Sequence, residues 1–193
     1  MTRVVVPAMV NAHSHAFQRD LRGAAERPGA PDDDFWSWRT EMFRLAGALE
    51  PESMRDVAAR VYGEMADAGY GAVGEFHYVH HRPDGTPYDD PNAMVIAVAE
   101  AAVDAGLRIV LLPAAYHRNG WDGADRPAEP GQRRFLDATL DAFLARVDDL
   151  RARGHTVGVA AHSVRAAQSR SSSRRSRNAA ALGSRKRGSP PRW

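Results

Sequence analysis

Three stretches of the chain repeat one order of features: an apolar stripe at helical spacing, then a glycine, then a short apolar run. The stripes run from Met54 to Met65, from Asn92 to Asp104 and from Phe135 to Leu150, and the glycines are Gly69, Gly106 and Gly154. Glycine just past a helix can adopt the left-handed conformation that ends it. The apolar runs that follow are residues 72–76, 108–114 and 156–161. Helices that alternate with strands predict an α/β fold.

The predicted strands are nearly continuous apolar runs, which is typical of a parallel sheet whose two faces are both covered. Another strand at Ala8–Asn11 would make four in all. An aromatic helix is expected to begin near Phe35, after a loop at Pro28–Asp34. Loops Arg82–Pro91 and Arg118–Gly131 each follow a strand, where α/β folds place their binding loops. The sequence therefore predicts about four βα units.

Charge divides the chain into two parts. Residues 1–166 hold 18 Arg against 24 Asp and Glu, whereas residues 167–193 hold seven Arg, one Lys and no acid. The second part is rich in Ser, Arg, Gly and Pro and keeps no apolar period, so it cannot bury enough surface to offset its ordering entropy. We predict a folded domain at 1–166 and a disordered basic tail at 167–193.

Neither cysteine chemistry nor a membrane segment is indicated. The chain has no cysteine, which excludes disulfides and thiolate metal ligands. Its longest apolar runs are too short to span a bilayer, and its first residues do not have the pattern of a signal peptide. We expect a cytoplasmic protein with no membrane partner.

A pair of histidines stands at the end of the first predicted strand, in the segment Pro7–His15. His13 and His15 are separated by one residue, so their side chains point to the same side of the strand. Such a pair can bind a divalent metal, most commonly Zn²⁺. The alternative interpretation is two polar loop residues. The short apolar strand and the preceding Pro-x-x-Val-Asn favour the metal site.

Five segments, in order along the chain, resemble formimidoylglutamate deiminases, a family of the amidohydrolase superfamily. They are His13–Gln18, Asp34–Arg39, Gly74–His81, Pro130–Phe135 and His162–Ala166, and the resemblance covers about residues 5–166. It implies the first half of a (β/α)8, TIM-like barrel. It also implies metal-dependent hydrolysis of formimidoylglutamate to formylglutamate and ammonia, a step of histidine degradation.

The resemblance also assigns site residues. It implies that His13 and His15 are metal ligands and that five residues line the substrate pocket: Gln18, Arg39, Tyr78, His162 and Arg165. Guanidinium groups suit the two carboxylates of such a substrate. Arg39, beside two tryptophans, could instead only stack or form a surface ion pair. His77, His80 and His81 are interpreted as pocket-edge or loop residues rather than ligands.

The site is expected to be incomplete. In the family, a further His ligand, an Asp ligand and the acid/base residues lie on later strands, so the catalytic residues fall outside these 193 residues. A full barrel needs roughly 250 residues. We therefore expect a truncated, inactive chain with an incomplete Zn²⁺ site. The resemblance allows a homodimer for the full-length enzyme.

Arg- and Ser-rich sequence begins after Ala166, where the family pattern continues into a helix. A shifted reading frame or a truncation would explain this change, and a genuine basic tail is the alternative. A non-catalytic protein that binds nucleic acid through the tail is a second hypothesis, but Trp193 is its only aromatic residue for base stacking. A deaminase of a purine or related ring is a third, although a neutral ring needs no pair of guanidinium groups.

Overall fold

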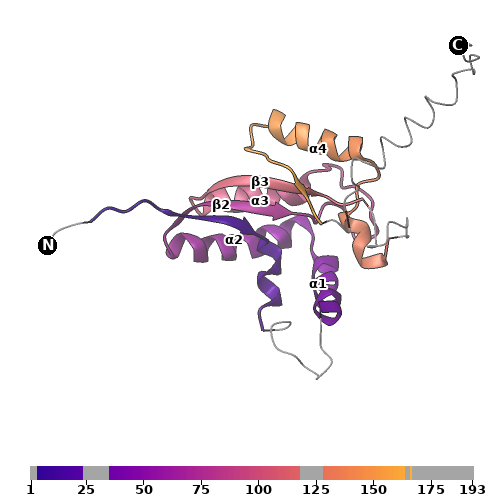
Figure 1. Cartoon of the computed structure of the whole chain (residues 1–193), viewed down its shortest axis with the longest axis horizontal. Coiled ribbons are helices and arrows are strands. Elements are labelled where there is room, and N and C mark those ends of the chain that lie inside the picture. Colours follow the sequence, from indigo (N-terminus) through magenta and orange to yellow (C-terminus); the bar gives the residue numbers. More distant parts are fainter. Residues whose placement is uncertain (1–3, 24–34, 118–127, 164–165, 167–193) are drawn as a thin grey trace, which may run out of the picture.

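The computed structural model describes residues 4–23, 35–117, 128–163 and 166, and a parallel four-stranded sheet lies at its centre (Figure 1). The strands are β1 (Met9–Ser14), β2 (Tyr70–His77), β3 (Arg108–Ala115) and β4 (Ala160–Ala161). They lie side by side in chain order, β1-β2-β3-β4. Parallel neighbours in chain order need a crossover between them. The predicted α/β fold is confirmed.

The register of the strands brings their carboxyl ends to one edge of the sheet. Ser14, the last residue of β1, is opposite Glu75 of β2. His77, the last residue of β2, is opposite Pro113 of β3. Residues that directly follow the four strands are therefore expected to lie near one another.

Among the described residues, four α-helices and two 3₁₀ helices connect the strands. They are η1 (Ala16–Leu21), α1 (Phe35–Ala48), α2 (Pro51–Asp67), α3 (Ala93–Asp104), η2 (Pro130–Phe135) and α4 (Leu140–Ala152). Helix α2 packs against α3 and η1, and α4 contacts β3. In Figure 1, α2 and α4 flank the sheet from below and above. The core lies between the sheet and these helices.

Helix α2 shows why the predicted units form. The Ser53 side chain accepts a hydrogen bond from the backbone N–H of Glu50, and Pro51 takes the first helical position, where its missing N–H costs little. The residues of its predicted stripe from Met54 to Tyr62 are buried, and Met65 is partly buried. Past the ends of α2, α3 and α4, three glycines have φ of +87°, +74° and +87°, as expected: Gly69, Gly106 and Gly154.

The third predicted unit needs a correction. Phe135 and Leu136 were expected to begin the helix, but Phe135 ends η2 and the helix begins at Leu140. Thr139 causes this late start, because its side chain accepts a hydrogen bond from the N–H of Ala142 and caps α4. The strand predicted at 156–161 is reduced to β4, with one further bridge between Val157 and Leu111.

The expectation that both faces of every strand are covered is wrong for β1. Met9 and Val10 are 50% and 64% exposed, and Val110 of β3 is 40% exposed. Strand β1 is an edge of the sheet, and the extended residues ahead of it leave the body of the molecule (Figure 1). The apolar runs therefore correctly predicted strands, but part of their apolar surface is open.

Several predicted segments lie outside the described residues. These are the tail at 167–193, the loop at Pro28–Asp34 and residues 118–127 of the loop Arg118–Gly131. The boundary expected at residue 166 therefore stays a prediction. Among the helices that the structure does describe, none is both long and apolar enough to cross a membrane.

Candidate active site

Side chains from all four strand ends meet at the carboxyl edge of the sheet. His13 belongs to β1 and His15 directly follows it, while Tyr78, Tyr116 and His162 each follow one of the other strands. The ring centroids of His15 and Tyr78 are 5.5 Å apart, and the His162 ring lies 4.9 Å from Tyr78 and 4.6 Å from Tyr116. These contacts form one continuous cluster.

The two histidines of the predicted metal pair face each other. The Nε2 atoms of His13 and His15 are 3.0 Å apart. Two tetrahedral zinc ligands, each about 2.0–2.1 Å from the metal, are separated by roughly 3.3 Å. The nitrogen atoms are therefore already placed close to the separation that a shared metal ion requires.

The environment of His15 favours the form of imidazole that binds metals. Its Nδ1 lies 2.8 Å from the carbonyl oxygen of Phe76, so Nδ1 carries the proton and Nε2 keeps a lone pair. Burial lowers the pKa of His15, and the bond to Phe76 only partly opposes this effect. The ring is therefore neutral at neutral pH. An oriented His15 ring, with its free nitrogen atom converging on that of His13, fits a divalent metal. Within the described residues, no set of three or more His, Cys, Asp or Glu completes such a site.

Gln18 and Tyr78 lie beside this pair. Gln18, on η1, donates a hydrogen bond of 2.6 Å from Nε2 to the hydroxyl oxygen of Tyr78. Burial raises the pKa of Tyr78, which keeps its hydroxyl protonated and able to donate to a ligand. Both residues, with His162, are among the five that the sequence placed in a substrate pocket. The structure brings these three together, and their role stays a prediction.

Arg39 reaches the cluster from α1. Its Nη1 is 2.8 Å from Glu129 Oε2, and its guanidinium lies over the Phe43 ring at 4.3 Å. Burial raises the pKa of Tyr116, although the hydrogen bond with Gln132 and the charge of Arg39 oppose this rise. Both stacking and ion pairing, which the sequence left open, are therefore observed. Arg165, the other predicted guanidinium ligand, lies outside the described residues.

Tyr116 and Gln132 were missed by the sequence reasoning. Gln132 Nε2 donates a 2.7 Å hydrogen bond to the Tyr116 hydroxyl, and Gln132 Oε1 accepts from the N–H of Glu129. This chain of contacts links the end of β3 to the residue that pairs with Arg39. Tyr116 could have been found as the residue that directly follows a strand, and Gln132 lies in a segment already singled out.

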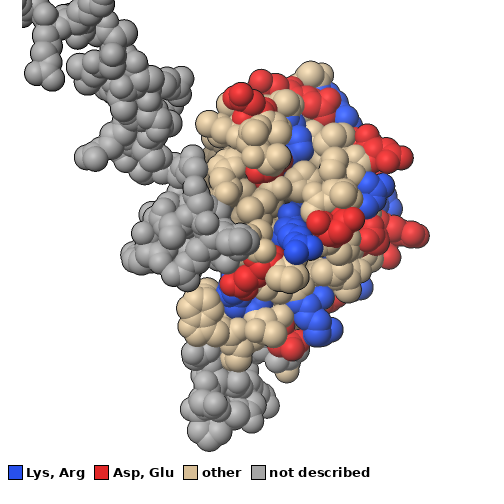
Figure 2. Space-filling model, turned by 90° about the vertical axis from the view of Figure 1, so that its right-hand side faces the viewer, with Lys and Arg blue, Asp and Glu red and all other residues tan. Residues whose placement is uncertain are grey.

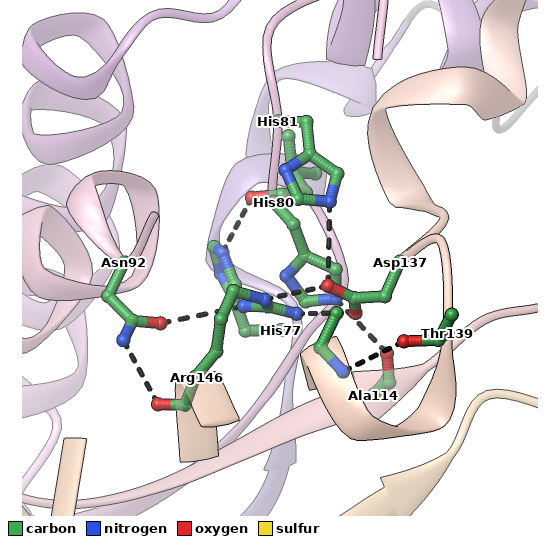
Figure 3. A network of polar contacts seen from close by, with 10 residues as sticks. His77, His80, His81, Asn92, Ala114, Asp137, Thr139 and Arg146 are labelled. Atoms are coloured by element: carbon green, nitrogen blue, oxygen red, sulfur yellow. Dashed lines mark hydrogen bonds and ion pairs between the residues drawn. The ribbon is translucent and has the colours of Figure 1, made fainter. Parts of the chain in front are cut away.

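His77, the last residue of β2, and His80 and His81, which follow the strand, belong to a separate network of polar contacts (Figure 3). His77 Nε2 is 2.8 Å from Val79 O, and His80 Nε2 is 3.1 Å from Ala114 O. His81 contacts the carboxylate of Asp137 at 3.5 Å. His80 and His81 do lie in a loop, but all three side chains are buried, so they do not line an open pocket edge.

Asp137 is the centre of this buried network. Arg146, on α4, donates two hydrogen bonds of 2.8 and 2.7 Å to its carboxylate. Burial alone would raise the pKa of Asp137, but the bonds from His81 and Arg146 hold it well below its usual value. Asn92 donates to Arg146 O at 3.0 Å, which joins the start of α3 to α4. The network fixes the segment that carries Tyr78 against two helices (Figure 3).

Charged side chains of both signs are mixed on the face of the molecule in Figure 2. Exposed ion pairs among the described residues include Arg55 with Asp104 and Arg153 with Asp90. A continuous basic surface, which would attract nucleic acid, does not appear among the described residues on this face.

The proteins of known family that this chain resembles are amidohydrolases and deaminases. The sequence model described as "Amidohydrolase family" matches residues 4–171. Formimidoylglutamate deiminase of Pseudomonas aeruginosa is 46% identical over 166 residues, which are 84% of this chain and 36% of that enzyme. An isoxanthopterin deaminase from an unknown prokaryotic organism is 32% identical over 153 residues, 79% of this chain and 29% of that enzyme.

A solved structure supports the same relationship. The crystal structure of an amidohydrolase from Brucella melitensis superposes with a TM-score of 0.77 at 43% identity, over 84% of this chain and 37% of that chain. The four parallel strands and their helices correspond to a half-barrel. The chain spans about a third of the length of the curated relatives that it matches.

Proposed function

Because the chain belongs to the amidohydrolase family, we propose that it supplies the first half of the barrel of a metal-dependent hydrolase that acts on formimidoylglutamate. The products would be formylglutamate and ammonia. The observation that carries this proposal is the convergence of His13 and His15 at the carboxyl edge of the sheet, in a cluster whose Tyr116 interacts with Arg39. The 46% identity to a formimidoylglutamate deiminase supports the choice of substrate.

His13 and His15 would hold the metal through Nε2, and zinc is the ion that best suits two imidazoles. When bound, a divalent metal supplies Lewis-acid activation of a hydrolytic water at neutral pH. The carbonyl of Phe76 keeps the His15 ring oriented. The two histidines alone would bind zinc weakly, because zinc sites normally have three or four protein ligands.

The remaining residues would bind and orient the substrate. Arg39 would bind one carboxylate, since guanidinium groups form paired hydrogen bonds with carboxylates. The Tyr78 hydroxyl, itself held by Gln18, would donate to a polar group near the metal. His162 lies between Tyr78 and Tyr116 and would help to exclude water from the pocket. Arg165 is proposed as the second carboxylate ligand.

A deaminase of a ring substrate is the second candidate, because isoxanthopterin deaminase is also a relative. Such a ring carries no pair of carboxylates, so a guanidinium at the site would be of less use to it. The proposal also includes a cytoplasmic location, with which the absence of cysteine accords.

A chimaera tests the function. Residues 4–166 would replace the matching segment of the Pseudomonas aeruginosa enzyme, which supplies the remaining strands. We expect ammonia release from formimidoylglutamate, and we expect His15→Ala to abolish it. A folded, zinc-loaded chimaera that releases ammonia only from isoxanthopterin would favour the second candidate, and one inactive on both would contradict the proposal.

The role of Arg39 can be tested in the same chimaera. Arg39→Met should raise KM for formimidoylglutamate by about 10-fold or more, because an ion pair between guanidinium and carboxylate is lost. Arg44→Met is the matched control, since Arg44 lies on the same helix and pairs only with Glu41 among the described contacts. Equal effects of the two substitutions on KM would contradict the assignment.

A further inference from the structure

Glu75 is a buried carboxyl that lies next to the residues flanking His15. It lies on β2, is 1% exposed and is opposite Ser14 in the sheet register. A carboxyl at such a place costs free energy of desolvation that an apolar side chain would not. Its contacts therefore indicate what it does.

The carboxyl of Glu75 reaches the two residues on either side of His15. Its Oε1 accepts a 2.7 Å hydrogen bond from the backbone N–H of Ala16. The hydroxyl of Ser14, which is itself buried, faces the same carboxyl. One side chain of the neighbouring strand thus interacts with the residues on both sides of His15, and the hydrogen bond at Ala16 fixes the backbone just after His15.

The residue after Glu75 holds the His15 ring as well. The carbonyl oxygen of Phe76 lies 2.8 Å from His15 Nδ1, and the Phe76 ring is 5.1 Å from the His15 ring. Two successive residues of β2 therefore fix both the backbone and the ring of His15. Gly74, just before them, lets β1 and β2 approach closely, because a Cβ at this position would lie 2.9 Å from Ala12 O.

We propose that Glu75 is a positioning residue for His15, holding the turn after β1 so that the Nε2 atoms of His13 and His15 converge. This inference rests on the proposed metal-binding role of the pair. Partners that orient a metal ligand typically change metal affinity by about 10–100-fold when they are removed. Glu75 would act in this way through the backbone rather than through the ring.

The test uses the whole 193-residue chain with three substitutions. Glu75→Met keeps the length of the side chain but removes both oxygen atoms, so the N–H of Ala16 loses its acceptor. Glu75→Gln keeps an oxygen that can accept this bond. Tyr62→Phe is the matched control, because the Tyr62 hydroxyl faces the same carboxyl from α2 without contacting residues 14–16 in any described bond.

Two quantities are measured for each variant. The first is the set of contacts of the His15 ring in the metal-free protein, seen by NMR as proton proximity to the rings of Phe76 and Tyr78. The second is the dissociation constant for zinc, measured by competition with a chromophoric chelator. We expect Glu75→Met to lose the ring contacts and to bind zinc about 10-fold or more weakly, while Glu75→Gln and Tyr62→Phe stay within about 3-fold of the wild type.

Every result of these measurements either supports or overturns the positioning role of Glu75. Retained ring contacts and zinc affinity in Glu75→Met would overturn the inference, as would an equal loss in Tyr62→Phe. If Glu75→Met does not fold, Glu75→Asp replaces it, since a carboxyl one methylene shorter falls short of the Ala16 amide and should give the same loss. If the wild type and His13→Ala bind zinc equally, the proposed metal site is wrong, and the ring contacts still decide the role of Glu75.

Discussion

At the scale of single residues, the buried ion pair between Asp137 and Arg146 has the largest expected effect on stability. Their side chains are 2% and 6% exposed. Removing one partner leaves an uncompensated charge in the core, so Asp137→Ala should lower the free energy of unfolding by about 3–5 kcal/mol. Urea denaturation followed by circular dichroism measures this change.

An exposed ion pair of the same chain is the control. Arg55 and Asp104 are 47% and 61% exposed. Asp104→Ala should cost less than about 1 kcal/mol, because water and salt screen exposed pairs. If Asp137→Ala and Asp104→Ala lowered the free energy of unfolding by similar amounts, burial would not determine the strength of the ion pair between Asp137 and Arg146.

His77 predicts a dependence of stability on pH. Burial lowers its pKa to about 3, against about 6.5 in an unfolded chain. Above pH 6.5 both states are neutral and the stability contribution is complete. Below pH 6.5, only the unfolded state binds a proton. The free energy of unfolding therefore decreases as the pH is lowered, by about 2 kcal/mol between pH 6.5 and pH 5. Burial lowers the pKa of His80 too and adds to the same slope.

The variant His77→Gln should flatten this slope, because glutamine does not titrate and can still donate to Val79 O. The free energy of unfolding would be measured by urea denaturation at several pH values between 5 and 8. An unchanged slope in His77→Gln would contradict the assignment.

At the scale of elements, the contact between β1 and β2 depends on Gly74. A Cβ there would lie 2.9 Å from the carbonyl oxygen of Ala12, which belongs to the backbone and cannot rotate away. Gly74→Ala should therefore push the strands apart and destabilise the protein by about 1–3 kcal/mol. Thermal unfolding should show a lowered Tm.

Gly63 gives a control of opposite sign. It lies within α2, and a Cβ there meets no atom within 4 Å. Alanine lowers the entropy of the unfolded chain and favours the helix, so Gly63→Ala should stabilise by about 0.5–1 kcal/mol. If both substitutions shift Tm in the same direction, the close approach at Gly74 does not matter.

The elements that the sequence predicted best are those whose apolar spacing and chain-ending glycines agree. Helices α2 and α3 and strands β2 and β3 were placed to within a few residues. The start of α4 was wrong because the cap at Thr139 overrides the apolar spacing of Phe135 and Leu136. Strand β4 is short because its length depends on pairing with β3, which no local pattern encodes.

The candidate site was predictable to a similar extent. The resemblance gave the residues that the structure brings together, such as His15 and Tyr78. It did not give Glu129 as the partner of Arg39, because the two are 90 positions apart and meet only through the fold. The role of Glu75 was hidden for the same reason, since its bond to Ala16 spans 59 positions.

At the scale of the whole molecule, we predict that the 193-residue chain alone is inactive on formimidoylglutamate. Its described residues hold no set of three or more His, Cys, Asp or Glu that could bind a metal. The acid/base residues that the family resemblance implies are expected on later strands. Loss of a positioned acid/base group typically costs about 10²–10⁴-fold in rate. Ammonia release is the measurement. Release by this chain, abolished by His15→Ala, would contradict the prediction.

The basic segment at 167–193 leads to a prediction about the coding DNA. If the reading frame shifts near codon 167, translation of the following DNA in another frame should give family-like sequence, with a strand bearing a His ligand and a later one bearing an Asp ligand. Sequencing from codon 160 onward tests this. If neither alternative frame gives such strands, a genuine basic tail is favoured.

The order of the strands also has a consequence for biosynthesis. Each strand lies next to the one made just before it, so each new βα unit finds its docking surface already in place as it leaves the ribosome. Translation adds about 5–20 residues per second, which leaves seconds for one unit to settle before the next appears. Assembly can thus proceed in one direction across the sheet, with β1 laid down first and every later unit added on the side away from it.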